Sequence, residues 1–414
     1  MLSTYTTSPR LGVSWDVRGD SSMKLGASAG LYTMPVPGVI LTSLFNDFSD
    51  VYTAYTYSGI NPDGTPVAPQ QIGSYTDAST IGEPVTLTAR NLRNARQDSY
   101  TVYLQDNQLL PHWSSTLEFN HSSVKRALAV WNDLNSNLSS PAYVYLQSLG
   151  YADPQIDNNL LINPGRAVVL DNDLDGDGRR ERVTIPGSAT GLAKPRRESD
   201  SASVELVHPE TPEQPFFVKF GYTWKHVYGN YEGYYGETNG NVLGAPNFRY
   251  GSLSAGSSGA LPADVRHVVL LNAAHTFGAS GLSLGFGAAW QSGSPRSCYS
   301  QYPDPDNAAY DAGLSAFYCN GVAVSRGSLG RFPSWWTLDM NAAYEKRWGP
   351  QLLRIELNVG NLLNQNTEIA AVPFYGAYTG QVDGRPTWQR DIYYGARTEL
   401  YPRTTGLILR YTWN

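Results

Sequence analysis

Apolar and polar residues alternate along several stretches of the chain, most clearly between residues 261 and 295. One face of this stretch carries Leu282, Leu284, Phe286, Ala288 and Trp290, and the intervening residues are small or polar. A rougher alternation runs through residues 269–277, and the Gly-rich segment 278–281 separates the two. A period of two is that of a β-strand, and a short Gly-containing link suits a tight turn. The pattern therefore predicts a β-hairpin.

The same period recurs along the chain and predicts about eleven strands in total. The other alternating segments lie at about residues 10–17, 23–31, 100–104, 113–119, 202–206, 216–224, 336–344, 353–359 and 407–413. No apolar run approaches the roughly 18 residues that a membrane helix needs. Strands of a membrane barrel place apolar residues only at every second position, so this absence leaves a membrane location open.

The connections between these strands alternate between short and long. The long ones cover about residues 33–97, 123–199, 229–263, 292–334 and 365–403. Outer-membrane barrels show this alternation because their periplasmic turns are short and their extracellular loops are long. The polar faces carry Lys24, Lys219 and Arg354, and such charges cost about 2–4 kcal/mol at the lipid midplane but are tolerated in a watery lumen. We therefore predict an all-β fold, an antiparallel transmembrane β-barrel wall whose apolar face contacts outer-membrane lipid.

Composition and charge agree with this fold and exclude several functions. The chain has 40 Gly, 28 Tyr and 10 Trp but only 16% charged residues, as expected for strands, turns and aromatic girdles. A net charge of −6 without a Lys/Arg stripe gives no indication of nucleic acid. The six His residues lack metal or catalytic spacing, and no serine elbow is present, so we expect no enzyme; a barrel lipase would need a surface Ser/His pair that we do not identify.

The amino terminus has no basic region followed by an apolar one, so no signal peptide is predicted. A surface protein without an export signal suggests that the numbering starts inside a longer chain. The two cysteines, Cys298 and Cys319, would close a loop of about twenty residues, and in an oxidising compartment they predict a disulfide. The alternative is two free thiols in a cytosolic protein.

One acidic segment carries the sharpest local chemistry of the chain. Its carboxylates belong to Asp171, Asp173, Asp175, Asp177 and Glu181. Calcium takes six to eight oxygens, which acidic residues at alternate positions around a Gly turn supply. An EF-hand would need Glu at position twelve, where counting from either of the first two aspartates gives Arg or Thr. Counted from the second, the D-x-D-x-D-G-x-x-E spacing resembles calcium loops of integrin-type repeats. We predict calcium; the alternative is a solvated acidic turn.

Several short motifs, in this order and spacing, resemble TonB-dependent outer-membrane receptors, especially the Oar-like branch. They are Ser8-Pro9-Arg10-Leu11-Gly12 (SPRLG), Asn91-Leu92 with Gln97-Asp98-Ser99-Tyr100 (NLK…QDEY), Leu261-Pro262-x-Asp264-x-x-His267 (LPxDxxH), Ser292-Gly293-x-Pro295 (SGxP), Gly330-Arg331-x-Pro333 with Leu338-Asp339 (GRxP…LD), Asn358-x-x-Asn361-Leu362-Leu363-Asn364 (NxxNLxN) and Tyr401-Pro402-Arg403 with Arg410-Tyr411 (PR…GLRYxF). The family usually ends on Phe, whereas this chain ends Trp413-Asn414.

This resemblance implies the carboxy-terminal half of a barrel of about 22 strands. Its plug, energy-coupling box and first barrel half are not in this sequence. It further implies a receptor in the outer membrane of a Gram-negative-type bacterium, taking up a scarce substrate through the TonB energy-coupling complex, which acts on the plug. The alternative is a passive surface-binding or adhesin barrel without energy coupling. No residue here indicates the ligand. We expect this chain alone neither to transport nor to stay monodisperse, because bilayers do not tolerate unpaired strand edges.

Overall fold

The structure is a computed structural model of the chain in which almost all regular elements are β-strands. It describes residues 6–35, 49–62, 64–78, 87–133, 138–154, 156, 160–234, 246–311, 313–371, 375–382, 385–393 and 397–413. Parts of the predicted connections 33–97, 123–199, 229–263, 292–334 and 365–403 therefore lie outside the described residues. The described helices include none that is long and apolar enough to cross a membrane.

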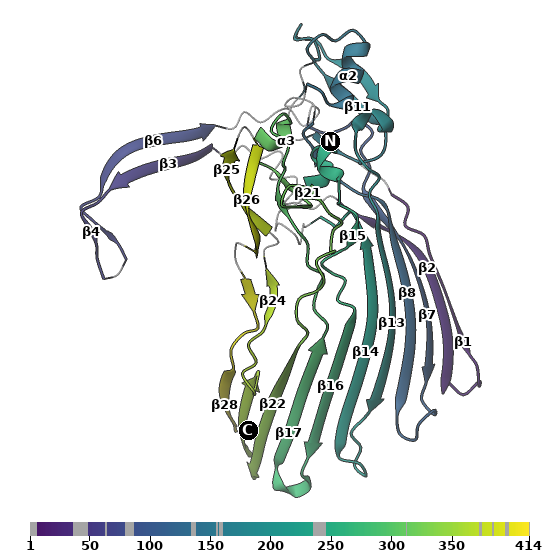
Figure 1. Cartoon of the computed structure of the whole chain (residues 1–414). Helices are drawn as coiled ribbons and strands as arrows, with labels where there is room; N and C mark the ends of the chain where they lie inside the picture. Colours follow the sequence, from purple (N-terminus) through teal and green to yellow (C-terminus); the bar gives the residue numbers. More distant parts are fainter. Residues whose placement is uncertain are drawn as a thin grey trace.

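One long antiparallel sheet dominates the molecule, and its strands follow each other in chain order (Figure 1). They are β1 (Arg10–Asp16), β2 (Met23–Met34), β7 (Ala95–Asp106), β8 (Ser114–Arg126), β13 (Arg197–His208), β14 (Phe216–Gly229), β16 (His267–Thr276), β17 (Leu282–Gln291), β22 (Trp335–Trp348), β23 (Gln351–Gly360) and β28 (Thr404–Thr412). The short β15 (Gly259–Ala260) adds to β14. These eleven consecutive strands confirm the predicted all-β fold.

Short and long connections lie at opposite ends of this sheet, which we call the turn end and the outer end (Figure 1). The predicted hairpin pairs β16 with β17, and η4 (Gly278–Ser280) forms its turn. Gly281 closes that turn with a φ of 74°, and a Cβ there would lie 2.0 Å from the Glu345 carbonyl oxygen. Only glycine combines that conformation with so close an approach of the backbone.

The two faces of the sheet differ in chemistry. One row of paired residues runs from Val13 through Ala27, Val102 and Phe119 to Ala202, all apolar. On the opposite face, charged and amide side chains pair with each other across strands; the Lys219 ammonium, for example, lies 2.8 Å from Glu205. This is the arrangement of a wall with lipid on one side and water on the other.

The apolar face is not covered by any described layer, and the buried clusters lie elsewhere. Leu11, Val13, Leu407 and Leu409 are between 65% and 77% exposed. All four apolar clusters of buried residues belong to the ends of strands and to the long connections. The sheet is therefore a wall, and the globular packing of the molecule is at the outer end.

The long connections contain regular elements that the sequence pattern did not predict. The connection from β8 to β13 holds β9 (Ala129–Trp131), α2 (Pro141–Ser148), β10 (Leu160–Ile162), β11 (Val168–Asn172), β12 (Glu181–Ile185) and η1 (Gly187–Thr190). The connection from β2 to β7 holds β3 (Ser49–Thr56), β4 (Gly59–Ile60), β5 (Pro66–Val67) and β6 (Gln70–Ala78), an arm that extends sideways in Figure 1.

The remaining connections hold shorter elements. These are η2 (Pro246–Phe248), η3 (Gly251–Ser254), β18 (Ser300–Gln301), α3 (Ala308–Asp311), β19 (Ser315–Ala316), β20 (Tyr318–Cys319), β21 (Val322–Ala323), β24 (Glu368–Ala371), β25 (Tyr375–Val382), β26 (Arg385–Tyr393) and β27 (Arg397–Glu399). The strands among them form two-stranded pairs, such as β25 with β26, and do not join the long sheet.

Candidate functional site: the acidic loop of the rim lobe

The described residues between 127 and 196 form a small folded unit at the outer end, which we call the rim lobe (Figure 1). Its core consists mainly of fully buried aliphatic side chains around one indole: Trp131, Ala142, Leu146, Leu160, Ile162, Val168, Leu170, Leu174 and Ile185. The helix α2 starts at Pro141 and is capped by Ser140, whose hydroxyl accepts the Tyr143 N–H at 3.1 Å. The lobe is therefore a rigid support for what it carries.

The acidic segment is the turn of the β11–β12 hairpin in this lobe. Leu174 lies inside the run of aspartates and is fully buried in the lobe core, which fixes the loop on the lobe. Gly176 and Gly178 have φ values of 77° and 84°, and a Cβ at either would meet nothing within 4 Å. These glycines are therefore needed for backbone conformation and not for space.

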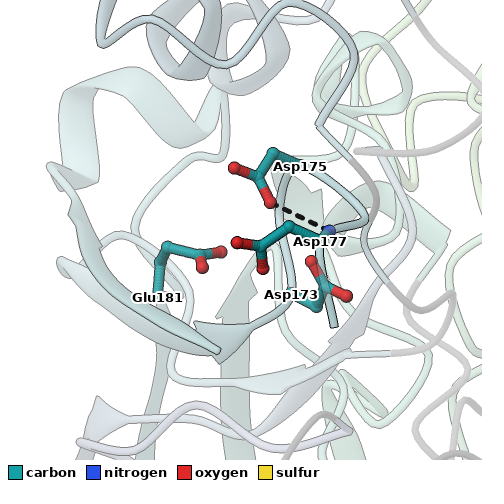
Figure 2. A group of neighbouring side chains, drawn as sticks. All are labelled: Asp173, Asp175, Asp177 and Glu181. Carbon is teal, nitrogen blue, oxygen red and sulfur yellow. Dashed lines mark hydrogen bonds between the residues drawn. The ribbon is translucent and has the colours of Figure 1, made fainter. Parts of the chain in front are cut away.

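The side chains of Asp173, Asp175, Asp177 and Glu181 converge (Figure 2). One ligand atom from each lies within 4.8 Å of those of the others. Backbone N–H groups hold them there. Asp173 accepts from Gly176 and from Gly178, both at 2.8 Å, and Glu181 accepts from Leu174 at 2.7 Å. Asp177 accepts from Arg179 at 2.7 Å, and its own N–H donates to Asp175 at 3.1 Å.

The fifth predicted ligand, Asp171, lies outside this group. It stands opposite Arg182 in the β11–β12 register and forms ion pairs with Arg182 at 3.1 Å and with Arg90 at 3.3 Å. Both cations compensate its charge, and Arg90 attaches the lobe to the segment before β7. The structure thus brings together four of the five carboxylates and gives Asp171 a structural contact.

The chemistry of this group fits a hard divalent cation. Four carboxylates at such short separations repel each other, and a cation removes that repulsion. Carboxylate oxygens are the ligands that calcium prefers, and a glycine-containing turn lets successive side chains point to one centre. The buried Leu174 and the backbone donors hold the loop in this shape.

The predicted cysteine pair lies in the connection from β17 to β22. Cys298 and Cys319 are joined in a disulfide, with their Cα atoms 5.2 Å apart. Close to it, Arg326 and Glu232 form an ion pair at 2.7 Å with side chains only 1% and 3% exposed. The Arg326 guanidinium also lies 4.2 Å from the centre of the Phe317 ring. These contacts tie the connection to the one before it.

Asp264 of the LPxDxxH segment is a buried junction of three parts of the chain. It accepts the Val227 N–H at 2.7 Å and pairs with His226 at 3.1 Å and Arg266 at 2.9 Å. It also pairs with Arg331 of the GRxP segment. Burial alone would raise the pKa of Asp264, but the hydrogen bonds from Arg266, Val227, Arg331 and His226 outweigh it and lower that pKa.

The other motif residues also hold strand ends together. The Asn361 N–H donates to Asp339 at 2.7 Å, and its side-chain amide donates to the Tyr401 carbonyl at 2.8 Å. Asn364 accepts the Arg403 N–H at 2.8 Å. Three segments that the sequence analysis singled out separately therefore form one junction.

Comparison with solved structures gives the class of fold. The outer membrane transporter YddB from Escherichia coli matches 98% of this chain over 40% of its own, at 14% identity and a TM-score of 0.51. The ferripyoverdine receptor of Pseudomonas aeruginosa matches 98% of this chain with 32% of its own length, at 11% identity and a TM-score of 0.43. The ferric yersiniabactin uptake receptor FyuA from Yersinia pestis matches 96% of this chain with 36% of its own length, at 9% identity and a TM-score of 0.39. No protein-family model and no curated protein matches.

The likeness to YddB and the exposed apolar face together define the chain as a wall of an outer-membrane β-barrel. This agrees with the predicted outer-membrane location. The chain spans 40% or less of the length of the three structures named above.

Proposed function

We propose that this chain is the carboxy-terminal wall of a TonB-dependent outer-membrane receptor of the Oar-like branch. In the whole protein, a plug coupled to the TonB complex drives uptake of a scarce substrate, and the outer-end connections contribute to its capture. The observation that carries the proposal is the eleven-stranded antiparallel sheet, apolar outside and polar inside, whose fold matches a transporter barrel along 98% of the chain.

Fractionation tests the proposed location. The chain fused to an export signal should be recovered with outer membranes and resist extraction by high salt, since its apolar face needs lipid. Recovery as a soluble monomer in the periplasm would overturn the proposal. The DNA directly upstream separates receptor from passive adhesin barrel: an in-frame plug and signal peptide support the receptor, and a reading frame without a plug supports the adhesin.

We also propose that the acidic loop binds calcium and stiffens the rim lobe. Support comes from the convergence of four carboxylates on a loop anchored by Leu174. The ion would stabilise the binding surface and take no part in a reaction.

Calorimetry of the full chain titrated with calcium chloride tests the calcium proposal. We expect Asp175→Asn to weaken binding at least tenfold, because it removes one carboxylate from the group. Asp171→Asn is the matched control, since this carboxylate is paired with Arg90 and Arg182. Equal heats for the wild-type chain and Asp175→Asn, or no heat for the wild-type chain, would refute the site.

A further inference from the structure

Five cationic side chains gather where β7 begins and β8 ends, below the rim lobe. We call them the basic cluster: Arg93, Arg96, Lys125, Arg126 and Arg166. Arg96 and Arg126 are directly opposite each other in the strand register. The Arg166 guanidinium donates to the Lys125 carbonyl at 3.5 Å, and Asn163 bonds both backbone polar groups of Arg93 at 2.8 Å.

Too few anions compensate this cluster within the described part of the chain. Asp98 forms ion pairs with two of the cations, at 3.9 Å from Arg96 and 3.8 Å from Lys125. Both distances are too long for hydrogen bonds. Glu198 lies within electrostatic range of Lys125 but is hydrogen-bonded to Arg196. For Arg93, Arg126 and Arg166 the described residues provide no ion pair.

The shortage of compensating anions is clearest at Arg126. The like charges of Arg166, Arg93 and Arg96 all act on it. Its Nη1 donates to the Asn94 carbonyl at 3.3 Å, whereas its Nε is buried and has no partner among the described residues. Like charges that face each other across strands are destabilising, and buried donors without a partner need an explanation. An anion would explain both features.

An apolar groove of about 500 Å³ lies directly below the cluster on the outward face of the same strands. Its floor is Ala202, which stands between the large rings of Phe119 on β8 and Trp224 on β14 in the strand register. Towards the outer end, the groove is lined by His121 and Asp200, which contact each other at 2.6 Å. Because Ala202 is small and its two neighbours are large, a groove forms in the outward face of the sheet at this position.

The spacing of the two features suits one amphipathic molecule. Arg96 and Tyr100, a groove residue, share a face of β7 four residues apart, which corresponds to about 13 Å along the strand. Guanidinium groups bind phosphate oxygens bidentately, and an acyl chain is the natural occupant of an apolar groove that faces lipid. We propose that the basic cluster and this groove bind one phosphate-bearing lipid, its phosphate on the arginines and an acyl chain over Ala202.

Native mass spectrometry of the full chain in detergent tests this site with three probes. They are phosphatidic acid, phosphatidylcholine with the same acyl chains, and inorganic phosphate. We expect phosphatidic acid to bind at least tenfold more tightly than either of the others, because only it offers both an unshielded phosphate and an acyl chain. Equal binding of inorganic phosphate and phosphatidic acid would show a free-anion site and overturn the proposal.

Two pairs of variants locate the site. Arg126→Gln with Arg166→Gln should lower the affinity for phosphatidic acid at least tenfold, whereas Arg10→Gln with Arg347→Gln removes the same charge elsewhere and should not. Ala202→Trp fills the groove and should lower the affinity for phosphatidic acid but not for inorganic phosphate. Ala288→Trp, on the same face of the sheet, is its control. Wild-type affinity in the double arginine variant or in Ala202→Trp would overturn the assignment.

Discussion

At the scale of single residues, the clearest result is that the motif residues hold strand ends and connections in place. Asp264, Arg331 and Gly293 illustrate this. Arg331 donates to the Gly293 carbonyl at 3.0 Å and to Asp264, so two motifs from different connections meet. A Cβ at Gly293 would lie 1.7 Å from the Phe332 carbonyl oxygen, so this position requires glycine. The resemblance identified these residues, but only the fold shows what they contact.

Replacing Asp264 by Asn should open this junction. The change leaves Arg331, Arg266 and His226 facing a neutral group in a fully buried position. Removing one partner of a buried ion pair costs about 3–5 kcal/mol. We expect trypsin to cleave at Arg266 and Arg331 at least tenfold faster than in the wild-type chain. Asp306→Asn, at an exposed site of the connection from β17 to β22, is the control; equal cleavage rates in both variants would contradict the role of Asp264.

The same carboxylate gives this junction a defined pH dependence. Because the folded-state pKa of Asp264 is lowered from 3.8, its stabilisation is present above that value and is lost as the pH falls through the folded pKa. Resistance to pepsin between pH 4 and pH 2 should therefore fall in the wild-type chain relative to Asp264→Asn, whose side chain does not titrate. If resistance to pepsin changed with pH to the same extent in both proteins, the result would contradict this dependence.

At the scale of elements, the sequence predicts the wall well and the rim lobe poorly, for a physical reason. A strand such as β17 has lipid on one side and water on the other along its whole length, so its residues must alternate. In the lobe, β9 and β10 have three residues each, and all six are buried. Such short strands, buried on both faces, leave no period to detect.

The acidic loop lies between these two cases. Its spacing predicted one calcium centre formed by Asp171, Asp173, Asp175, Asp177 and Glu181, and the structure brings the last four of these together. The spacing could not show that Asp171 belongs to the paired part of the hairpin, where Arg182 stands opposite. The basic cluster was not predicted because its members come from three separate segments, around residues 93–96, 125–126 and 166, that only the fold brings together.

At the scale of the whole molecule, the direction of the edge strands decides how the sheet can be completed. All ten neighbouring pairs along the eleven strands are antiparallel. With eleven strands, the first and last, β1 and β28, run in the same direction, both towards the turn end (Figure 1). An antiparallel barrel that includes this wall therefore needs an odd number of further strands.

The chain on its own should accordingly fail to form a closed barrel. Direct closure, or pairing with a second copy in the same orientation, would join β1 to β28 in parallel and break the antiparallel order of the sheet. The unpaired edges in lipid should instead lead to mixed oligomers. We expect a broad elution profile in detergent and no mobility shift between unheated and boiled samples on a denaturing gel. A compact band that shifts on boiling, as closed barrels give, would contradict this expectation. Coexpression with a complementary wall of an odd number of strands should produce such a band.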